Sequence, residues 1–177
     1  MQMRLRPAGM SDLDLLRAWD EKPHVIRAVG TDGALDWDNE LPRRLSWREL
    51  LIAEVQGRAI GVLQIIDPAE EETRYWGAIE PNLRAIDIWI GEEADLGRGH
   101  GTAMMHLALE RCFAEAAVTA VVVDPLADNR CAHRFYRRLG FAAVERRRFD
   151  DENCLVHRLE RSRWRQSIDH RSSLSDR

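Results

Sequence analysis

Residues 124–141 read DPLADNRCAHRFYRRLGF, and this stretch decides the fold. It opens with an Asp-Pro turn, continues with helical spacing to a glycine, and resumes with an apolar residue, Phe141. A glycine directly after a helix commonly adopts the left-handed conformation that ends the helix. The stretch therefore predicts a helix over 127–139 that leads into a strand.

The residues before this stretch predict a strand, a turn and a helix with a phosphate-binding shape. Residues 118–123 (VTAVVV) are rich in β-branched side chains, which is typical of a strand buried on both faces. Upstream, 85–91 (AIDIWIG) predicts another strand, and 96–101 (LGRGHG) a glycine-rich turn that opens a helix over 102–116. In such a turn, successive backbone N–H groups face one concavity at a helix N-terminus, which favours a pyrophosphate.

The rest of the chain completes an α+β domain. The remaining regular elements are a short strand, a helix and two hairpins, at 4–6, 11–19, 50–66 and 141–159. Two long segments, 22–44 and 67–82, are predicted to be irregular, and a loop of such length in a compact domain is usually functional or mobile. We expect a mixed, strongly twisted sheet with helices on both faces in residues 1–160, followed by a polar, frayed tail over 161–177.

Composition excludes several classes of protein. The chain has 177 residues, 45% hydrophobic and 32% charged, and no apolar run nears the roughly 20 residues that span a bilayer. The segment MQMRLRPAGM lacks a hydrophobic signal, so we expect a cytoplasmic protein with no membrane partner. Cys112, Cys131 and Cys154 have no pairing pattern and are expected to be reduced thiols. No histidine has a second ligand at metal spacing, so no metal is expected.

Charge is distributed unevenly along the chain. Residues 1–97 hold 19 acidic and 11 basic residues, whereas residues 98–177 hold 11 acidic and 15 basic ones. This division favours a cation bound by the first half and an anion bound by the second, although chance segregation of solvated charge is the alternative. Nucleic acid is not an expected partner, because the chain is acidic overall and few aromatic residues accompany the arginines at 146–148.

Both motifs resemble the GNAT superfamily of acyltransferases. Residues 129–141 match its N-x-x-A-x-x-x-Y-x-x-x-G-F signature, and 97–102 match its x-x-G-x-G-T loop. The family often has Gln or Arg at the position of Leu96, but the loop binds mainly through backbone amides. The resemblance implies an acetyl-coenzyme A-dependent N-acyltransferase with a splay between the two central strands of the sheet.

The resemblance also implies positions for acetyl-CoA. The pyrophosphate would lie on the turn, formed by Leu96, Gly97, Arg98, Gly99, His100, Gly101 and Thr102. The pantetheine arm would pass Trp89 and Ile90, where a backbone N–H would polarise the thioester carbonyl. Asn129 would form a hydrogen bond with the pantetheine arm. Tyr136 would protonate the departing thiolate; packing against the sheet is its alternative role.

Two carboxylates are candidates for activating an amine, which must lose a proton before it attacks a thioester. Asp87 lies within an apolar strand, where an unpaired charge is costly. Asp124 ends the next strand, so both carboxylates could converge on the acetyl group. The alternatives are an ion pair between Asp87 and Arg84, and a simple turn role for Asp124 before Pro125.

The two aspartates, the turn and Tyr136 together resemble the aminoglycoside 6′-N-acetyltransferases. In that family the matching aspartates contact the amines of the drug. The resemblance implies a polycationic acceptor, and carboxylates and tryptophans on the two irregular segments are further candidate contacts: Asp20, Glu21, Trp37, Asp38, Glu71, Glu72 and Trp76.

Other functions stay open at this stage. A GNAT enzyme could instead acylate a siderophore amine, a polyamine or a protein N-terminus. A noncatalytic domain that binds CoA or an aminoglycoside is the alternative from a different class. The oligomeric state is expected to be a monomer or a homodimer.

Overall fold

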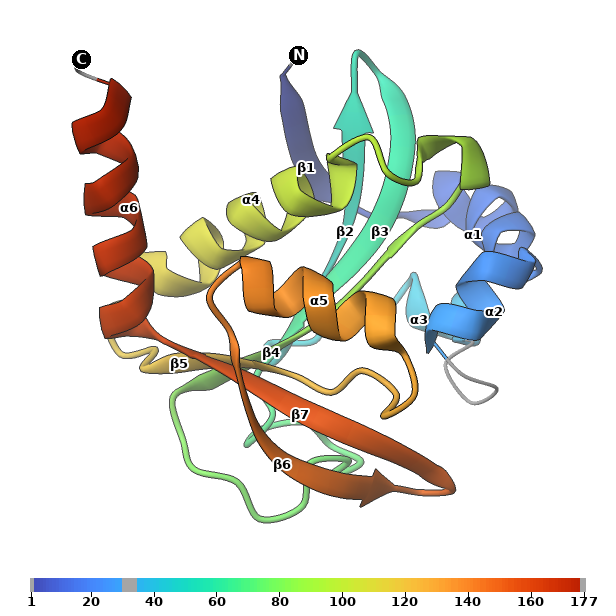
Figure 1. Ribbon diagram of the computed structural model, residues 1–177. Coiled ribbons are helices and arrows are strands. Elements are labelled where there is room, and N and C mark those ends of the chain that lie inside the picture. The colour runs from blue at the N-terminus through green and yellow to red at the C-terminus, as the bar shows by residue number, and fades with distance from the viewer. Residues whose placement is uncertain (1, 30–34, 176–177) are drawn as a thin grey trace.

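A computed structural model of the chain describes residues 2–29 and 35–175, with side chains described through residue 169. Within these ranges, seven strands form one sheet in the order β1-β2-β3-β4-β5-β7-β6, with only β4 and β5 parallel. Figure 1 shows the sheet and its strands, which are β1 (Met3–Pro7), β2 (Arg48–Val55), β3 (Arg58–Ile66), β4 (Leu83–Ile90), β5 (Ala120–Val123), β6 (Ala142–Phe149) and β7 (Glu152–Glu160). The predicted mixed sheet of an α+β fold is confirmed.

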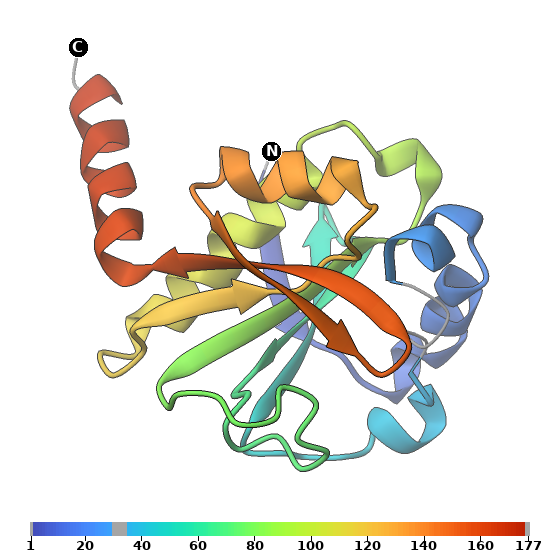
Figure 2. The same cartoon turned by 60° about the horizontal axis from the view of Figure 1, so that its bottom comes forward.

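Helices cover both faces of the sheet, as predicted (Figures 1 and 2). Two successive residues of β2 show that each face has its own core, because neighbouring side chains of a strand point to opposite faces. Leu51 packs in one core with Met105 of α4, whereas Ile52 packs in another with Leu16 of α1. The first face carries α4 (His100–Ala114) and α5 (Arg130–Arg138), and the second carries α1 (Leu13–Asp20), α2 (Pro23–Val29) and α3 (Trp37–Glu40).

Strands β4 and β5 separate partway along the sheet. Their parallel pairing joins residues 83–85 to residues 120–122, and β5 pairs on its other side with β7. Strand β4 continues to Ile90 along β3 alone. The splay implied by the family resemblance is therefore present, and it opens toward the end of β4 that precedes the glycine-rich turn.

The segment 22–44 is more regular than predicted. It contains α2 and α3, because Pro23 suits the first position of a helix and Val25 and Trp37 supply buried apolar contacts. Residues 30–34 of this segment lie outside the described ranges. The segment 67–82, by contrast, has no helix or strand among its residues, all of which are described, as predicted.

The prediction of a frayed tail is wrong for residues 161–175, which form helix α6 (Arg161–Ser175) directly after β7. Its first turn is tied to the domain. The Arg161 guanidinium donates to the carbonyls of Val118 and Phe113 at 2.6 and 2.8 Å, and Trp164 packs its ring against Phe113 at 4.7 Å. A single tryptophan and arginine supply this contact, too few for a periodic core pattern; residues 176 and 177 lie outside the described ranges.

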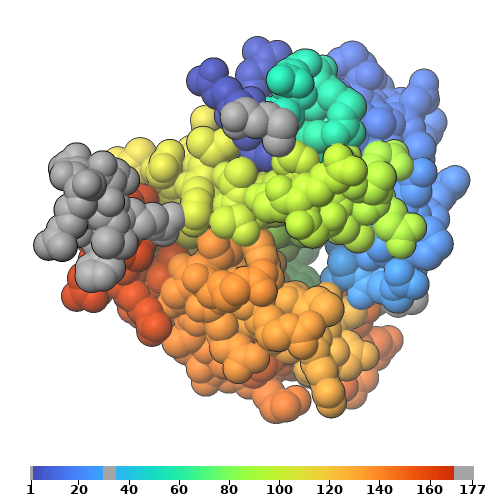
Figure 3. All heavy atoms as spheres, turned by 45° about the horizontal axis from the view of Figure 1, so that its top comes forward, coloured from blue at the N-terminus to red at the C-terminus, as the bar shows by residue number. Residues whose placement is uncertain are grey.

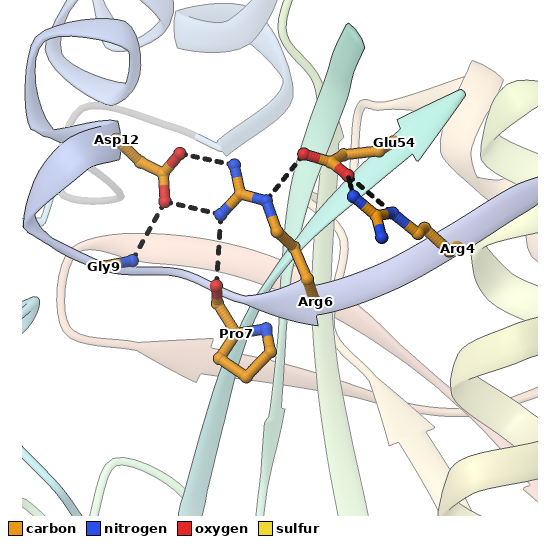
Figure 4. A network of polar contacts seen from close by, with 6 residues as sticks. All are labelled: Arg4, Arg6, Pro7, Gly9, Asp12 and Glu54. Carbon is orange, nitrogen blue, oxygen red and sulfur yellow. Dashed lines mark hydrogen bonds and ion pairs between the residues drawn. The ribbon is translucent and has the colours of Figure 1, made fainter. Parts of the chain in front are cut away.

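A polar network with two buried carboxylates, Glu54 and Asp12, joins the first strand to the start of the helical layer (Figure 4). Glu54 of β2 accepts hydrogen bonds from Arg4 and Arg6 at 2.8 and 2.6 Å. Arg6 also binds the Asp12 carboxylate through both terminal nitrogens, and Asp12 accepts from the Gly9 N–H at 2.9 Å. These hydrogen bonds hold the pKa values of Asp12 and Glu54 below their usual range.

Among the described residues, no helix has the length and apolar character that crossing a membrane requires.

Candidate active site

One continuous cavity of about 1320 Å³ joins the two faces of the sheet through the splay. The glycine-rich turn and α5 line it on one side, and residues of β4 and the segment 71–76 line it on the other. Figure 3 shows its outer hollow between the start of α4 and α5. Single-ligand pockets measure roughly 300–1,000 Å³, so this cavity has room for two ligands that meet at the splay.

The turn at the start of α4 has the geometry of an anion site. Gly97 and Gly99 have φ angles of 71° and 83°, a left-handed conformation that favours glycine, and Gly99 caps α4. Residues of the turn line the cavity, and the first N–H groups of the 15-residue helix α4, which have no partner within the helix, would be available to an anion there. The residues concerned are Leu96, Gly97, Gly99, His100, Gly101 and Thr102; Arg98 is not part of the lining.

An ion pair between the buried Asp95 carboxylate and the exposed Arg58 side chain supports the start of the turn. The Arg58 guanidinium donates to both oxygens of Asp95 at 2.7 and 2.8 Å, and these bonds keep the pKa of Asp95 below its usual range. The imidazole Nε2 of His100 lies 4.0 Å from the same carboxylate. Sequence patterns do not reveal this support, because Arg58 belongs to a distant hairpin.

The backbone of β4 supplies a free edge within the splay. The Gly91 N–H donates to the Ile60 carbonyl of the β3 side at 2.9 Å, and groups of an antiparallel strand alternate between its two sides. The N–H groups of Ile88 and Ile90 therefore point into the splay, whereas that of Trp89 points to β3. Of the two residues expected to polarise a thioester, Ile90 has the required direction.

Residues of the second face hold the end of β4 in place. The Ile90 carbonyl is 3.0 Å from Nε2 of His24 in α2, which fixes the end of the strand. The Trp89 ring is buried against Trp37 at 6.3 Å.

Asp87 points into the cavity from the middle of β4. It lies opposite Gln64 in β3, and the Gln64 amide donates to its Oδ2 at 2.9 Å. Burial and the neighbouring charge of Asp124 raise the pKa of Asp87 to about 7, although the Gln64 hydrogen bond opposes the shift. The ion pair with Arg84 is not formed, since Arg84 binds Asp67 and Glu115. A carboxyl group with this pKa can exchange a proton near neutral pH.

Asp124 reaches the same cavity from the end of β5. Its Oδ2 accepts a hydrogen bond of 2.8 Å from the hydroxyl of Tyr75, in the irregular segment. Burial raises the pKa of Asp124, and the hydrogen bond from Tyr75 counteracts part of this rise. The two carboxylates are close enough to disfavour simultaneous ionisation unless a cation lies between them.

Tyr136 lies on α5 within the cavity lining. Its ring packs against Phe135 and Phe141 with centroids at 5.2 and 5.6 Å. Burial, followed by the charges of Asp87 and Asp124, raises the pKa of the Tyr136 phenol, so it stays protonated at neutral pH. Packing and proximity to the carboxylates therefore occur together at this residue.

Asn129 has a structural role that the family resemblance does not imply. It is the N-cap of α5, and its side-chain oxygen accepts from the Ala132 N–H at 3.0 Å. Asn129 also lines the cavity, so its amide nitrogen remains the group suited to a ligand.

The candidate acceptor contacts divide into two groups. Glu71, Glu72 and Trp76 line the cavity, whereas four others lie outside its lining: Asp20, Glu21, Trp37 and Asp38. Asp20 accepts from the Trp37 indole at 2.5 Å, and Asp38 pairs with Arg17. The structure also adds Gln64 and Tyr75. A polar residue opposite Asp87 could have been found from strand register, whereas the Tyr75 contact depends on the path of the loop.

Among the described residues, no group of three or more histidine, cysteine, aspartate or glutamate side chains is arranged to hold a metal ion.

A cavity that joins a glycine-rich helix N-terminus to two carboxylates through a splayed sheet is the arrangement expected of a transferase with a nucleotide cofactor. The family described as "Acetyltransferase (GNAT) domain" matches residues 9–149, and the chain belongs to this family.

Individual relatives share the sequence and the fold. The chain is 28% identical over 145 residues to the aminoglycoside N(6′)-acetyltransferase type 1 of Klebsiella pneumoniae, covering 77% of this chain and 72% of that protein. It is 33% identical over 72 residues to a kanamycin resistance protein of Rhizobium radiobacter, covering 40% and 67%. The structure of AAC(6′)-Ib in complex with ribostamycin and coenzyme A superposes with a TM-score of 0.85 at 24% identity, covering 94% and 97%.

Proposed function

We propose that this protein transfers the acetyl group of acetyl-CoA to a primary amine of an aminoglycoside, the 6′-amine, by direct attack in a ternary complex. The observation that carries the proposal is the convergence of Asp87, Asp124 and Tyr136 on one cavity that continues to the glycine-rich turn. Both substrates can then be held at once, so no acyl-enzyme is needed.

The residues of the first face fit acetyl-CoA. The turn offers backbone N–H groups to the pyrophosphate, the free edge of β4 offers those of Ile88 and Ile90 to the arm, and Asn129 offers its amide. Acetyl-CoA supplies the thioester, and the Ile90 N–H is directed into the splay where the thioester carbonyl would be polarised.

The carboxylates of the second face bind and deprotonate the amine. Asp124 holds the ammonium group through its charge, and Asp87 accepts one proton from it as the base. The amine nitrogen then forms a bond to the acetyl carbon, and the carbon–sulfur bond breaks. Tyr136 gives its proton to the departing sulfur, and the nitrogen loses its second proton as the amide forms. This second proton restores the Tyr136 phenol, so the one proton released overall is the one that Asp87 holds.

The choice of an aminoglycoside rests on the relatives and on the walls of the cavity. The Klebsiella relative is named an aminoglycoside N(6′)-acetyltransferase, and the Rhizobium relative a kanamycin resistance protein. Besides Asp87 and Asp124, the cavity lining contains Glu72, which pairs with Arg43, and the aromatic residues Tyr75 and Trp76; Glu71 also lines it, but its carboxylate binds N–H groups of its own segment. Such a surface suits a molecule with several ammonium groups on sugar rings.

A thiol-release assay with acetyl-CoA tests the proposal. The acceptors are kanamycin, tobramycin, an aminoglycoside with a 6′-hydroxyl group, lysine, a polyamine and a short peptide. We expect release with the two 6′-amino compounds and none with the 6′-hydroxyl analogue. Release with lysine, the polyamine or the peptide alone would refute the aminoglycoside assignment, and CoA binding without any release would indicate a noncatalytic domain.

A further inference from the structure

Tyr75 occupies a defined place in the irregular segment beside the two carboxylates. Its ring stacks on Phe149 of β6 with centroids 4.5 Å apart and planes at 8°, and it meets Trp76 edge-on at 6.0 Å. The side chain nevertheless remains partly exposed, since the residue is 43% accessible. Its hydroxyl is directed inward, to the Asp124 carboxylate at 2.8 Å.

The segment that carries Tyr75 is held in shape from within. The buried Glu71 carboxylate accepts the backbone N–H groups of Thr73 and Tyr75 at 2.8 and 2.9 Å. From outside the segment, Arg147 of β6 donates to the Trp76 carbonyl, and its guanidinium lies 5.0 Å from the Phe149 ring centre. The position of the Tyr75 hydroxyl is therefore fixed by contacts that do not involve Asp124.

We propose that Tyr75 is a positioning residue of the amine site, and that its hydroxyl orients the Asp124 carboxylate and stabilises its ionised form. A hydroxyl on a preorganised ring can donate only when the carboxylate keeps its orientation toward the splay. The second oxygen of Asp124 is then left for the substrate. The identification of that substrate as an amine rests on the function proposed above, whereas the Tyr75–Asp124 contact does not.

The two carboxylates are positioned by different parts of the fold. Asp87 receives its hydrogen bond from a neutral amide of the same sheet, and Asp124 receives its own from a phenol of the loop. Loop and sheet therefore control separate halves of the amine site. The ionisable groups that surround Asp124 come from β4, the loop, α5, β6 and β7: Asp87, Tyr75, Tyr136, Arg147, Glu152 and Cys154.

The test compares the wild type with Tyr75→Phe, which removes the hydroxyl and keeps the stacked ring. A hydrogen bond to a charged group corresponds to an effect of about tenfold or more, so we expect the KM for the amine to rise by at least about tenfold. The KM for acetyl-CoA and the unfolding midpoint should not change. In an Asp124→Asn background, Tyr75→Phe should have no further effect on the amine.

A second measurement reads the contact without turnover. Carboxyl carbon NMR of ¹³C-labelled aspartate gives the titration of Asp124, assigned by its loss in Asp124→Asn. Removal of the donated hydrogen bond should move this titration to higher pH. A loss of loop packing alone would raise the KM without this shift and would overturn the inference.

The two measurements separate the inference from the proposed function. If the wild type acetylates aminoglycosides and Tyr75→Phe changes neither the KM for the amine nor the Asp124 titration, the positioning role is overturned. If the wild type acetylates no amine but the titration still moves, the proposed function fails and the Tyr75–Asp124 contact is supported.

Discussion

The two sides of the cavity are built from different parts of the chain. On the α4 and α5 side, the groups that we propose to bind a ligand are mainly backbone N–H groups, presented by a short contiguous turn and a strand edge. On the opposite side they are side chains from β4, the end of β5 and the segment 71–76, which are far apart in sequence.

This difference has a physical basis in the ligands that we propose for each side. A pyrophosphate needs several N–H groups in one concavity, which a glycine-rich turn provides regardless of most side chains. An amine needs a carboxylate whose pKa is matched to proton transfer, and such a pKa results from burial and from neighbours. The first side therefore depends on local backbone conformation, and the second on tertiary packing.

The largest effect should come from Asp87→Asn, on the side of the cavity that is built from side chains. Loss of a general base typically costs 10²–10⁴-fold, so we expect kcat/KM for the amine to fall by about that factor. CoA affinity, measured by calorimetry, should stay within about twofold, because the turn is unchanged. Near wild-type turnover would remove Asp87 from the mechanism.

The pH dependence of the same variant is a further control. Burial raises the pKa of Asp87 to about 7, and a base must be deprotonated to act. Wild-type kcat/KM should therefore fall as pH decreases through about 7. This acid limb should be absent in Asp87→Asn; an identical limb in both proteins would assign it to another group.

Tyr136→Phe should have the next largest effect. The phenol is kept protonated by burial and by two neighbouring carboxylates, as a proton donor requires. Because the packing against Phe135 and Phe141 survives the change, we expect kcat to fall by about 10–100-fold with both KM values nearly constant. An unchanged kcat would leave Tyr136 with a packing role alone.

The backbone half is tested by Gly99→Ala against a matched glycine. Gly99 and Gly57 both have positive φ, at 83° and 79°, and an added Cβ would meet nothing within 4 Å at either position. A left-handed alanine costs about 1–2 kcal/mol. At Gly99 the strain should weaken CoA binding by about tenfold without changing the KM for the amine, whereas Gly57→Ala should lower only the unfolding midpoint. Equal CoA affinity in the two variants would contradict a backbone-built site.

The two halves also differ in how far sequence alone predicts them. The turn over 96–102 and the helix that follows are encoded by contiguous residues, so both their position and their shape could be predicted. Asp87 could be found as a charge in an apolar strand. Its partner Gln64 requires knowledge of the β3–β4 register, and Tyr75 requires the course of a segment without periodic pattern.

The predicted acidic contacts show most clearly what sequence alone does not predict about the site. Net negative charge in the first half suggested a cation site, but charge counts do not tell which carboxylates face a cavity. Asp20 and Asp38 instead bind Trp37 and Arg17 within the helical layer. Composition favoured a cation, in line with the proposed function, whereas only packing determines which residues line the cavity.

The smallest effect on activity should come from the polar network outside both halves. Glu54→Gln removes the charge that Arg4 and Arg6 contact, so the unfolding midpoint at neutral pH should fall by a few degrees, with acetyl transfer unchanged. The pKa of Glu54 is lowered in the folded state, so its contribution is present above the unfolded pKa of about 4.3 and is lost as pH falls through the folded value. The deficit of the variant should therefore shrink in acid.

Glu49→Gln is the matched control on the same strand. Glu49 pairs with Arg111 at the surface, where both side chains are about half exposed, and such pairs contribute little. Scanning calorimetry from pH 7 to pH 3 should show a pH-dependent deficit for Glu54→Gln and almost none for Glu49→Gln. Equal losses of unfolding midpoint in the two variants would mean that burial of the Glu54 carboxylate adds nothing to the ion pair. A loss of acetyl transfer in Glu54→Gln would mean that the helical layer, through Asp12, shapes the amine site as well.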